Sequence, residues 1–358
     1  MLSLPRFRPP RHARGLLAIA CIAVAAASVL SACDRKQSSG SNADQPKPLR
    51  IAVVPKGTTH EFWRTVHAGA SRAAADLGVE MVFRGPERED DRAQQISLVQ
   101  NLVGSRRYDA IVLAPLDDRA LVAPVREATA AGVPIVIFDS GLDQSLVRPG
   151  SDFVCFVATD NKQGGRLAGD SLAAAMGNTG KVLLLRYAEG SASTLLREQG
   201  FIDAISAHEG ITLIDPRRYA GATRATAQEA AENLLNAHPD IEGVFCSNES
   251  ATFGMLLALR SRGLAGKVKF VGFDSSETFI EALREGHMQS FVVQNPMRMG
   301  ELALRAAVDH LRGAPVAPVI DTGVAVVTLE NLDSPEIVGI IRPTLAPSEG
   351  TSTSPGSP

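Results

Sequence analysis

Apolar and polar residues are arranged along this chain in blocks. Short runs rich in Val, Ile, Leu and Phe recur through the middle of the sequence. Uninterrupted apolar runs of this length are typical of β-strands that are buried on both faces. We therefore expect strands at 51–54, 79–83, 110–113, 134–138, 154–157, 181–185, 243–246 and 269–273.

The segments between these runs are rich in alanine and have helical spacing. Helices are expected at 62–77, 91–105, 165–176, 194–206, 223–235 and 296–311. Strand and helix alternate, which predicts an α/β fold with mostly parallel sheets flanked by helices. Several helical segments are followed by a glycine that suits a left-handed C-cap, namely Gly78, Gly132, Gly263 and Gly286.

Polar or aromatic residues gather just after several of the predicted strands. Such clusters occur at 56–63, 139–140, 248–249 and 274–275. In open parallel sheets, ligands bind outside the carboxyl ends of the strands. These four clusters are therefore the candidate site, and the helices between them are scaffold.

The first residues have the pattern of a secretory signal. Four arginines precede an apolar run at 16–30, which ends in Leu30-Ser31-Ala32-Cys33. The run has about 15 residues, fewer than the ~20 that span a bilayer. Its end resembles a bacterial lipobox, which implies a signal peptide at 1–32 and acylation of Cys33. The alternative is a soluble secreted protein with an incidental cysteine.

The two flanks of the body are poor in apolar residues, so 33–49 and 343–358 are expected to be a disordered tether and tail. About 290 residues lie between them, which predicts two domains. Loss of the signal would leave 32 basic and 39 acidic residues, a formal charge of −7 that disfavours nucleic-acid binding. Cys155 and Cys246 lie in apolar runs and are expected to be buried free thiols.

The chain from 50 to about 330 resembles the type I periplasmic binding proteins of the ribose-binding kind. The matching residues include Thr59-His60-Glu61-Phe62-Trp63, Pro134-Ile135-Val136-Ile137-Phe138-Asp139, Ala158-Thr159-Asp160-Asn161, Arg197, Asn248-Glu249, Val271-Gly272-Phe273-Asp274 and Gln294. The resemblance implies two similar lobes joined by a three-segment hinge. One lobe would comprise 50–159 and 295–322, and the other 160–294 and 323–342. Lactose-repressor-type regulators share these lobes, but a DNA-binding headpiece stands where this chain has its signal segment.

The resemblance also implies a set of ligand-binding residues. Asp139 and Asp274 would accept sugar hydroxyls, although each could instead be a helix N-cap. Arg197 would donate to ligand oxygens, or could be an exposed arginine paired with Glu198. Asn248 and Gln294 would both donate and accept, while turn chemistry and a hinge role are the respective alternatives.

The aromatic positions Phe62, Trp63 and Phe273 would pack on sugar faces, with burial in the core as the alternative for an aromatic near a helix start. Trp63 is the only tryptophan.

Four positions depart from the ribose-binding pattern. Lys56 replaces a serine, His60 an asparagine, Ser140 an arginine and Ala222 an aromatic residue. The last two changes remove contacts and open volume. They imply a ligand other than ribose: a different or bulkier sugar, a polyol or a signalling furanosyl compound. Lys56 and His60 could instead recognise an acidic group.

The predicted function is that of a periplasmic, lipid-anchored, monomeric solute-binding protein that delivers a sugar or polyol to an inner-membrane ABC permease. A sensor that signals to a membrane receptor or kinase is the close alternative. A glycosidase that uses Asp139 and Asp274 is a further alternative. Against it, the sequence has no nucleophile motif, metal-ligand spacing or phosphate loop. No cofactor, metal or catalytic residue is therefore expected.

Overall fold

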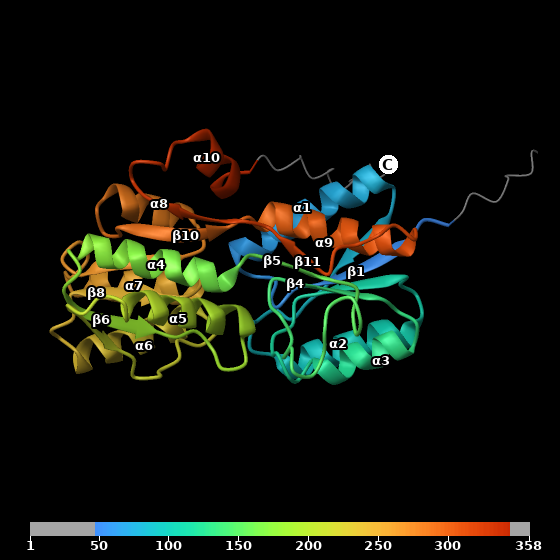
Figure 1. Ribbon diagram of the computed structural model, residues 1–358, viewed down its shortest axis with the longest axis horizontal. Coiled ribbons are helices and arrows are strands. Elements are labelled where there is room, and N and C mark those ends of the chain that lie inside the picture. The colour runs from blue at the N-terminus through green and yellow to red at the C-terminus, as the bar shows by residue number, and fades with distance from the viewer. Residues whose placement is uncertain (1–46, 344–358) are drawn as a thin grey trace, which may run out of the picture. The chain divides into compact units, whose positions relative to one another are not determined.

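The computed structural model of the protein describes residues 47–343 and contains two six-stranded sheets (Figure 1). The first has the order β11-β5-β4-β3-β1-β2, and all its strands are parallel. Its strands are β1 (Arg50–Val54), β2 (Glu80–Phe83), β3 (Ala110–Leu113), β4 (Ile135–Phe138), β5 (Phe156–Ala158) and β11 (Val319–Asp321).

The second sheet has the order β12-β10-β9-β8-β6-β7. It is parallel except for β12, which runs antiparallel to β10. Its strands are β6 (Gly180–Leu185), β7 (Ile211–Ile214), β8 (Gly243–Cys246), β9 (Lys269–Phe273), β10 (Ser290–Gln294) and β12 (Val324–Val327). All eight predicted strands are present, and the predicted α/β class with mostly parallel sheets is confirmed.

Helices cover both faces of each sheet, as buried parallel sheets require. On the first sheet, α1 (Glu61–Leu77) and α9 (Pro296–Leu311) cover one face, while α2 (Arg92–Ser105) and α3 (Val122–Ala130) cover the other. On the second sheet, α4 (Asn161–Ala175) and α5 (Ala192–Ile205) cover one face. The opposite face carries α6 (Arg224–Ala237), α7 (Glu249–Ser261), α8 (Glu277–Arg284) and α10 (Pro335–Ile341).

We call the first sheet and its helices the N-lobe and the second sheet and its helices the C-lobe. The chain passes between them three times: from β5 to α4, from β10 to α9, and from β11 to β12. Each lobe therefore contains segments that are far apart in the sequence (Figure 1).

The glycines and cysteines singled out in the sequence have the predicted conformations and environments. The four glycines expected to end helices have φ angles between 66° and 77°, the left-handed region that a C-cap requires. Cys155 and Cys246 are buried free thiols, as predicted, and burial raises the pKa of Cys155 to about 12.

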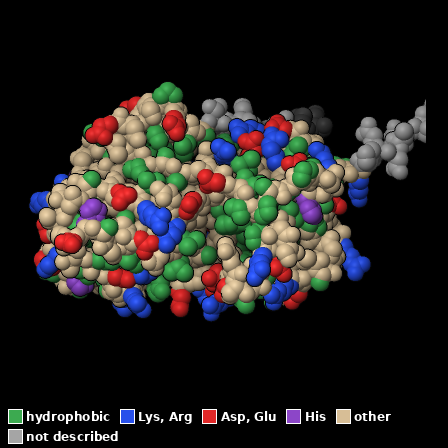
Figure 2. Space-filling view, in the orientation of Figure 1, with side chains coloured by type: hydrophobic (Ala, Val, Ile, Leu, Met, Phe, Trp, Pro, Cys, Tyr) green, Lys and Arg blue, Asp and Glu red, His purple; other side chains and the backbone are tan. Residues whose placement is uncertain are grey.

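The surface in view in Figure 2 has Lys and Arg side chains interspersed with Asp and Glu. Within residues 47–343, no helix is long and apolar enough to cross a bilayer. The predicted signal segment 1–32, the lipid site at Cys33 and nearly all of both predicted flanks lie outside the described residues.

Candidate functional site

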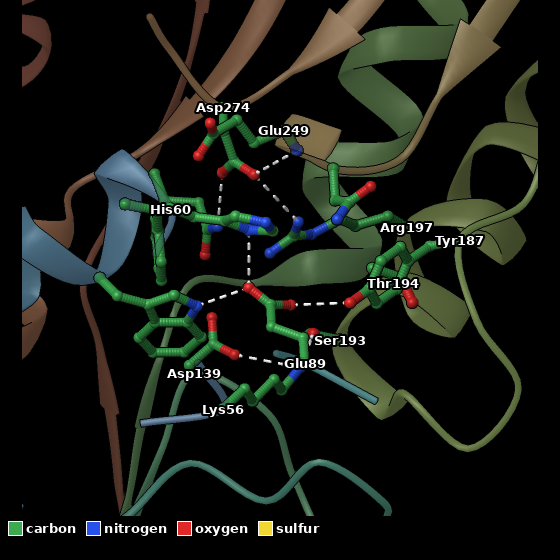
Figure 3. A pocket seen from close by; sticks show the side chains of 14 residues that line it. Lys56, His60, Glu89, Asp139, Tyr187, Ser193, Thr194, Arg197, Glu249 and Asp274 are labelled. Carbon is green, nitrogen blue, oxygen red and sulfur yellow. Dashed lines mark hydrogen bonds and ion pairs between the residues drawn. The ribbon is translucent and has the colours of Figure 1, made fainter. Parts of the chain in front are cut away.

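A small cavity of about 30 Å³ lies between the two lobes (Figure 3). This volume is far below the about 300–1,000 Å³ of sites that hold a small molecule, so the lobes as they stand leave room for little more than water, and a ligand requires them to part. Most of its lining residues follow strands, at the carboxyl ends of the two sheets. The N-lobe contributes Lys56, His60, Phe62, Trp63, Glu89 and Asp139, and the C-lobe contributes Tyr187, Ser193, Thr194, Arg197, Asn248, Glu249, Asp274 and Gln294.

Asp139 and Asp274 occupy equivalent places in the two lobes. They directly follow β4 and β9, and both have left-handed backbones, with φ of 60° and 67°. Non-glycine residues in this region are uncommon and gather at functional sites. Neither aspartate is the N-cap residue of a helix that follows it: Ser276 caps α8, and no helix begins at Asp139. The alternative role as N-caps is therefore wrong.

Lys56 bridges the lobes at the base of the cavity. Its Nζ lies 3.2 Å from Asp139 Oδ2 and 3.0 Å from Ser193 Oγ of the C-lobe. Ser140 is buried behind this contact, where its Oγ accepts a hydrogen bond from the Ser193 backbone N–H at 3.2 Å. Ser140 is not among the residues that line the cavity, and its hydroxyl is used in this interlobe bond.

Glu89 is the centre of a second interlobe network (Figure 3). Its Oε1 lies 2.8 Å from His60 Nδ1 and accepts a hydrogen bond from Trp63 Nε1 at 2.6 Å. Its Oε2 accepts from the Tyr187 hydroxyl of the C-lobe at 2.8 Å. Burial by itself lowers the pKa of His60, but the Glu89 carboxylate outweighs burial and raises that pKa to about 9. Burial by itself raises the pKa of Glu89, but His60 and then Lys56 hold it at about 2.

Arg197 reaches the cavity from α5 and is only 2 % exposed. Its Nε donates to Asn161 Oδ1 at 2.8 Å, and its Nη1 donates to the Ser247 carbonyl at 3.0 Å. Its guanidinium lies 4.0 Å from the centre of the Phe273 ring, and Nη1 is 3.9 Å from Asp274 Oδ2. Burial lowers the pKa of Arg197, and Asp274 opposes that effect. The alternative of an exposed arginine paired with Glu198 is therefore wrong.

Asp274 is held by two donors of its own lobe. Oδ1 accepts from Gln294 Nε2 at 2.8 Å, and Oδ2 accepts from the Glu249 backbone N–H at 3.0 Å. Burial raises the pKa of Asp274 to about 6, and Arg197 offsets part of this rise. The amide of Gln294 is oriented by this bond, and its Oε1 has no hydrogen-bond partner among residues 47–343.

Asn248 has the turn role that the sequence left open. Its Oδ1 accepts from the Ala251 N–H at 3.1 Å and caps α7, while Nδ2 donates to Ser250 Oγ. The residue also lines the cavity. Capping and lining are compatible because α7 begins at the rim of the C-lobe sheet.

The aromatic residues divide between wall and core. Phe62 and Trp63 line the cavity with their rings edge to face at 4.8 Å. Phe273 is fully buried against α4 and lies beneath Arg197, so it supports the arginine and does not line the cavity. Ala222 is buried and is also absent from the lining.

Sequence reasoning missed four lining residues: Glu89, Tyr187, Ser193 and Thr194. The strand-end rule could have found two of them, because Tyr187 follows β6 and Glu89 lies in the loop after β2. Glu249, a fifth residue, lies in the predicted cluster at 248–249, but the sequence assigned it no ligand-binding role. The two hydroxyl residues lie at the start of α5, a place that sequence alone does not assign to a cavity.

The charged groups around the cavity pair with one another. Lys56 faces Asp139, His60 faces Glu89, Arg197 lies near Asp274, and Arg224 pairs with Glu249. With each cation beside a carboxylate, the lining suits a neutral ligand better than the acidic group that Lys56 and His60 could have recognised. Among residues 47–343, no group of three or more His, Cys, Asp or Glu side chains could hold a metal ion.

Two lobes joined by three crossings, with paired polar groups facing one interlobe cavity, define a two-lobed solute-binding protein. A family model described as a periplasmic binding protein domain matches residues 51–315. The chain belongs to this family, which implies a location in the periplasm.

Characterised relatives include the D-ribose/D-allose-binding protein of Pseudomonas aeruginosa, 31% identical over 80% of this chain and 90% of that protein. A ribose import binding protein of Bacillus subtilis is 28% identical over 85% of this chain and 96% of its own length. A solved carbohydrate transporter solute-binding protein of Agrobacterium radiobacter, in complex with D-arabinose, has a TM-score of 0.78 and 35% identity. That match covers 83% of this chain and all of the other.

A second solved structure is an ABC transporter solute-binding protein of Agrobacterium vitis with bound D-fucose. It has a TM-score of 0.78 and 35% identity, and the match covers 82% of this chain and 99% of the other.

Proposed function

We propose that this protein captures a neutral sugar between its lobes and delivers it to an ABC-type importer. The observation that carries the proposal is the lining of the interlobe cavity. Its charges are internally paired, yet it presents buried hydrogen-bonding atoms from both lobes. The sugars named for its relatives and structural neighbours support the same ligand class.

Sugar hydroxyls suit this lining because each can donate and accept a hydrogen bond. Asp139 and Asp274 supply carboxylate acceptors, and Gln294 Oε1 adds an amide acceptor. Nη2 of Arg197 makes no hydrogen bond to a described residue, so it is a donor for a ligand oxygen. The rings of Phe62 and Trp63 offer an apolar surface for C–H groups.

Delivery requires a change of shape that the importer can recognise. A ligand that contacts both lobes stabilises the closed form through contacts that the open form lacks. The interlobe bonds of Lys56 and Glu89 support a closed arrangement in this structure. The protein binds and releases its sugar without chemical change, and neither a catalytic residue nor a cofactor is involved.

The lipobox-like sequence supports anchoring of the mature protein to a membrane through acylated Cys33. The protein acts as a monomer whose lobes divide at 159/160, 294/295 and 322/323. Incorporation of labelled palmitate tests the anchor: wild-type protein should be labelled and Cys33→Ser should not. Equal labelling of both would exclude acylation at this cysteine.

A thermal-shift screen followed by calorimetry tests the binding function. D-ribose, D-allose, D-arabinose and D-fucose form the first panel, and a bound sugar raises the melting temperature of the folded protein. Asp274→Ala and Arg197→Ala should abolish that rise. Both side chains are buried and bonded, so the unliganded variants should also melt lower than wild type. Undiminished affinity in either variant contradicts the site, and sustained turnover of glycosides contradicts the binding-only function.

A further inference from the structure

Glu249 is the first residue of α7, and its side chain lies in the cavity wall (Figure 3). The side chain is 2 % exposed. Oε1 pairs with Arg224 Nη2, but Oε2 has no hydrogen-bond partner among the residues that the structure describes. A buried carboxylate oxygen without a donor is costly. This atom is therefore available to accept a hydrogen bond from a group in the cavity.

The Glu249 carboxylate is held in place by contacts within its own lobe. Arg224, which pairs with its other oxygen, lies with its guanidinium 4.0 Å from the centre of the Phe253 ring. The Glu249 backbone N–H donates to Asp274 Oδ2 at 3.0 Å, which fixes the start of α7 against the end of β9. Because both the backbone and the carboxylate of Glu249 are held, Oε2 points in a defined direction. An acceptor with a defined direction can discriminate between sugar stereoisomers.

Gln294 Oε1 is a second buried acceptor without a protein donor in the same lobe. Gln294 and Glu249 both bond Asp274, so the two unpartnered acceptors flank one carboxylate. An aliphatic surface would leave both oxygens unsatisfied, and a carboxylated ligand would place a like charge beside Glu249. Two hydroxyl groups of one neutral sugar would satisfy both.

We propose that Glu249 determines sugar specificity by accepting a hydrogen bond from one particular ligand hydroxyl at its Oε2. The inference rests on the proposed sugar-binding function and gives a role to a residue of the predicted 248–249 cluster to which the sequence assigned no ligand contact. It selects for sugars that carry a hydroxyl facing the start of α7, and against the corresponding deoxy sugars.

The test uses the sugar that binds best among D-ribose, D-allose, D-arabinose and D-fucose, together with its mono-deoxy derivatives. Calorimetry compares wild type with Glu249→Ala and with Glu249→Gln, which keeps the size of the side chain. For the parent sugar, Glu249→Ala should weaken binding by about tenfold to a hundredfold, the usual effect of losing a charge-assisted hydrogen bond. For one deoxy derivative, the same substitution should change affinity by less than about twofold, because the coupled hydroxyl is already absent.

Glu277→Gln is the matched control. Glu277 is also the first residue of a helix and also pairs with an arginine, Arg342, but it lies on the surface. Its substitution should leave every affinity unchanged. If the parent sugar binds both Glu249 variants as tightly as wild type, or if no deoxy derivative shows coupling, the inference is overturned while the sugar-binding function stands. If no sugar binds wild type, the proposed function fails, and the inference fails with it.

Discussion

The pair formed by His60 and Glu89 shows how burial and charge act together on single residues. Burial alone would disfavour the charged form of each side chain, and the opposite charge of the partner favours it. His60 is one of the departures from the ribose-binding pattern, and its partner is a residue that sequence reasoning did not select. The pair explains why a histidine can occupy this wall without an acidic ligand.

The pH dependence of folding tests this pair. The pKa of His60 is raised in the folded protein, so its contribution to stability is complete below about pH 6.5 and is lost as pH rises towards 9. At pH 6, His60→Gln should lower the free energy of unfolding by about 2 kcal/mol. By pH 9 most of that difference should have disappeared. Chemical unfolding followed at several pH values measures it.

His310→Gln is the control for this measurement, because His310 lies exposed on α9. Its difference from wild type should be small at every pH. A His60→Gln penalty that does not shrink between pH 6.5 and 9 would show that the imidazole is not held charged by Glu89.

The helix pair α4 and α5 illustrates how elements position the site. A Cβ atom on Gly200 would lie 2.0 Å from the Lys162 carbonyl oxygen, and one on Gly165 would lie 1.9 Å from the Arg197 carbonyl oxygen. The two helices therefore pack backbone to backbone, and this close approach carries Arg197 to the cavity. The N-lobe repeats the arrangement, with Gly69 and Gly300 between α1 and α9.

Gly200→Ala tests the importance of this contact. Because the new methyl group meets backbone, which cannot move aside as a flexible side chain can, the substitution should cost at least about 1–3 kcal/mol of unfolding free energy. It should also weaken sugar binding, since α5 carries Arg197. Denaturant unfolding and calorimetry measure the two effects.

Gly104→Ala is the matched control within α2. A Cβ atom there would have nothing within 4 Å, so the change should stabilise the protein by about 0.5–1 kcal/mol. Equal effects of the two substitutions would mean that the close packing of α4 on α5 is not needed to place the arginine.

At the scale of the whole molecule, the two lobes meet through a few bonds between groups far apart in the sequence. Tyr187 and Glu89 are separated by 98 positions, and Lys56 and Ser193 by 137. The Asp118 backbone N–H also donates to the Gly190 carbonyl at 3.0 Å. Each of these bonds requires the two lobes to be in contact, so we expect them to slow the release of a bound sugar.

Tyr187→Phe should therefore speed sugar release. Loss of its hydroxyl removes the bond to Glu89 and should raise the dissociation rate by about tenfold. Stopped-flow fluorescence of Trp63, the only tryptophan and a residue of the cavity wall, measures that rate. Tyr219→Phe, on the same lobe but 45 % exposed, should release the sugar at the wild-type rate. If the Tyr187→Phe rate is also unchanged, the hydroxyl does not hold the lobes together.

The sequence by itself determined the alternation of buried strands and helices, the left-handed glycine caps and the polar clusters at strand ends. Each of these depends on local hydrophobicity, backbone freedom or chain direction, which a short stretch of sequence contains. Asp139, Arg197, Asp274 and Gln294 were expected at the site, and the structure gathers them around one cavity.

Only the tertiary structure decided which side chains face the cavity and which lie behind its lining. Phe273 immediately precedes Asp274, but it packs against α4 while the left-handed backbone of Asp274 directs its carboxylate to the cavity. Glu89 lines the cavity where its loop meets Tyr187 of the other lobe. Contacts of this kind depend on how two separately formed sheets dock, and no local pattern in the sequence contains that information.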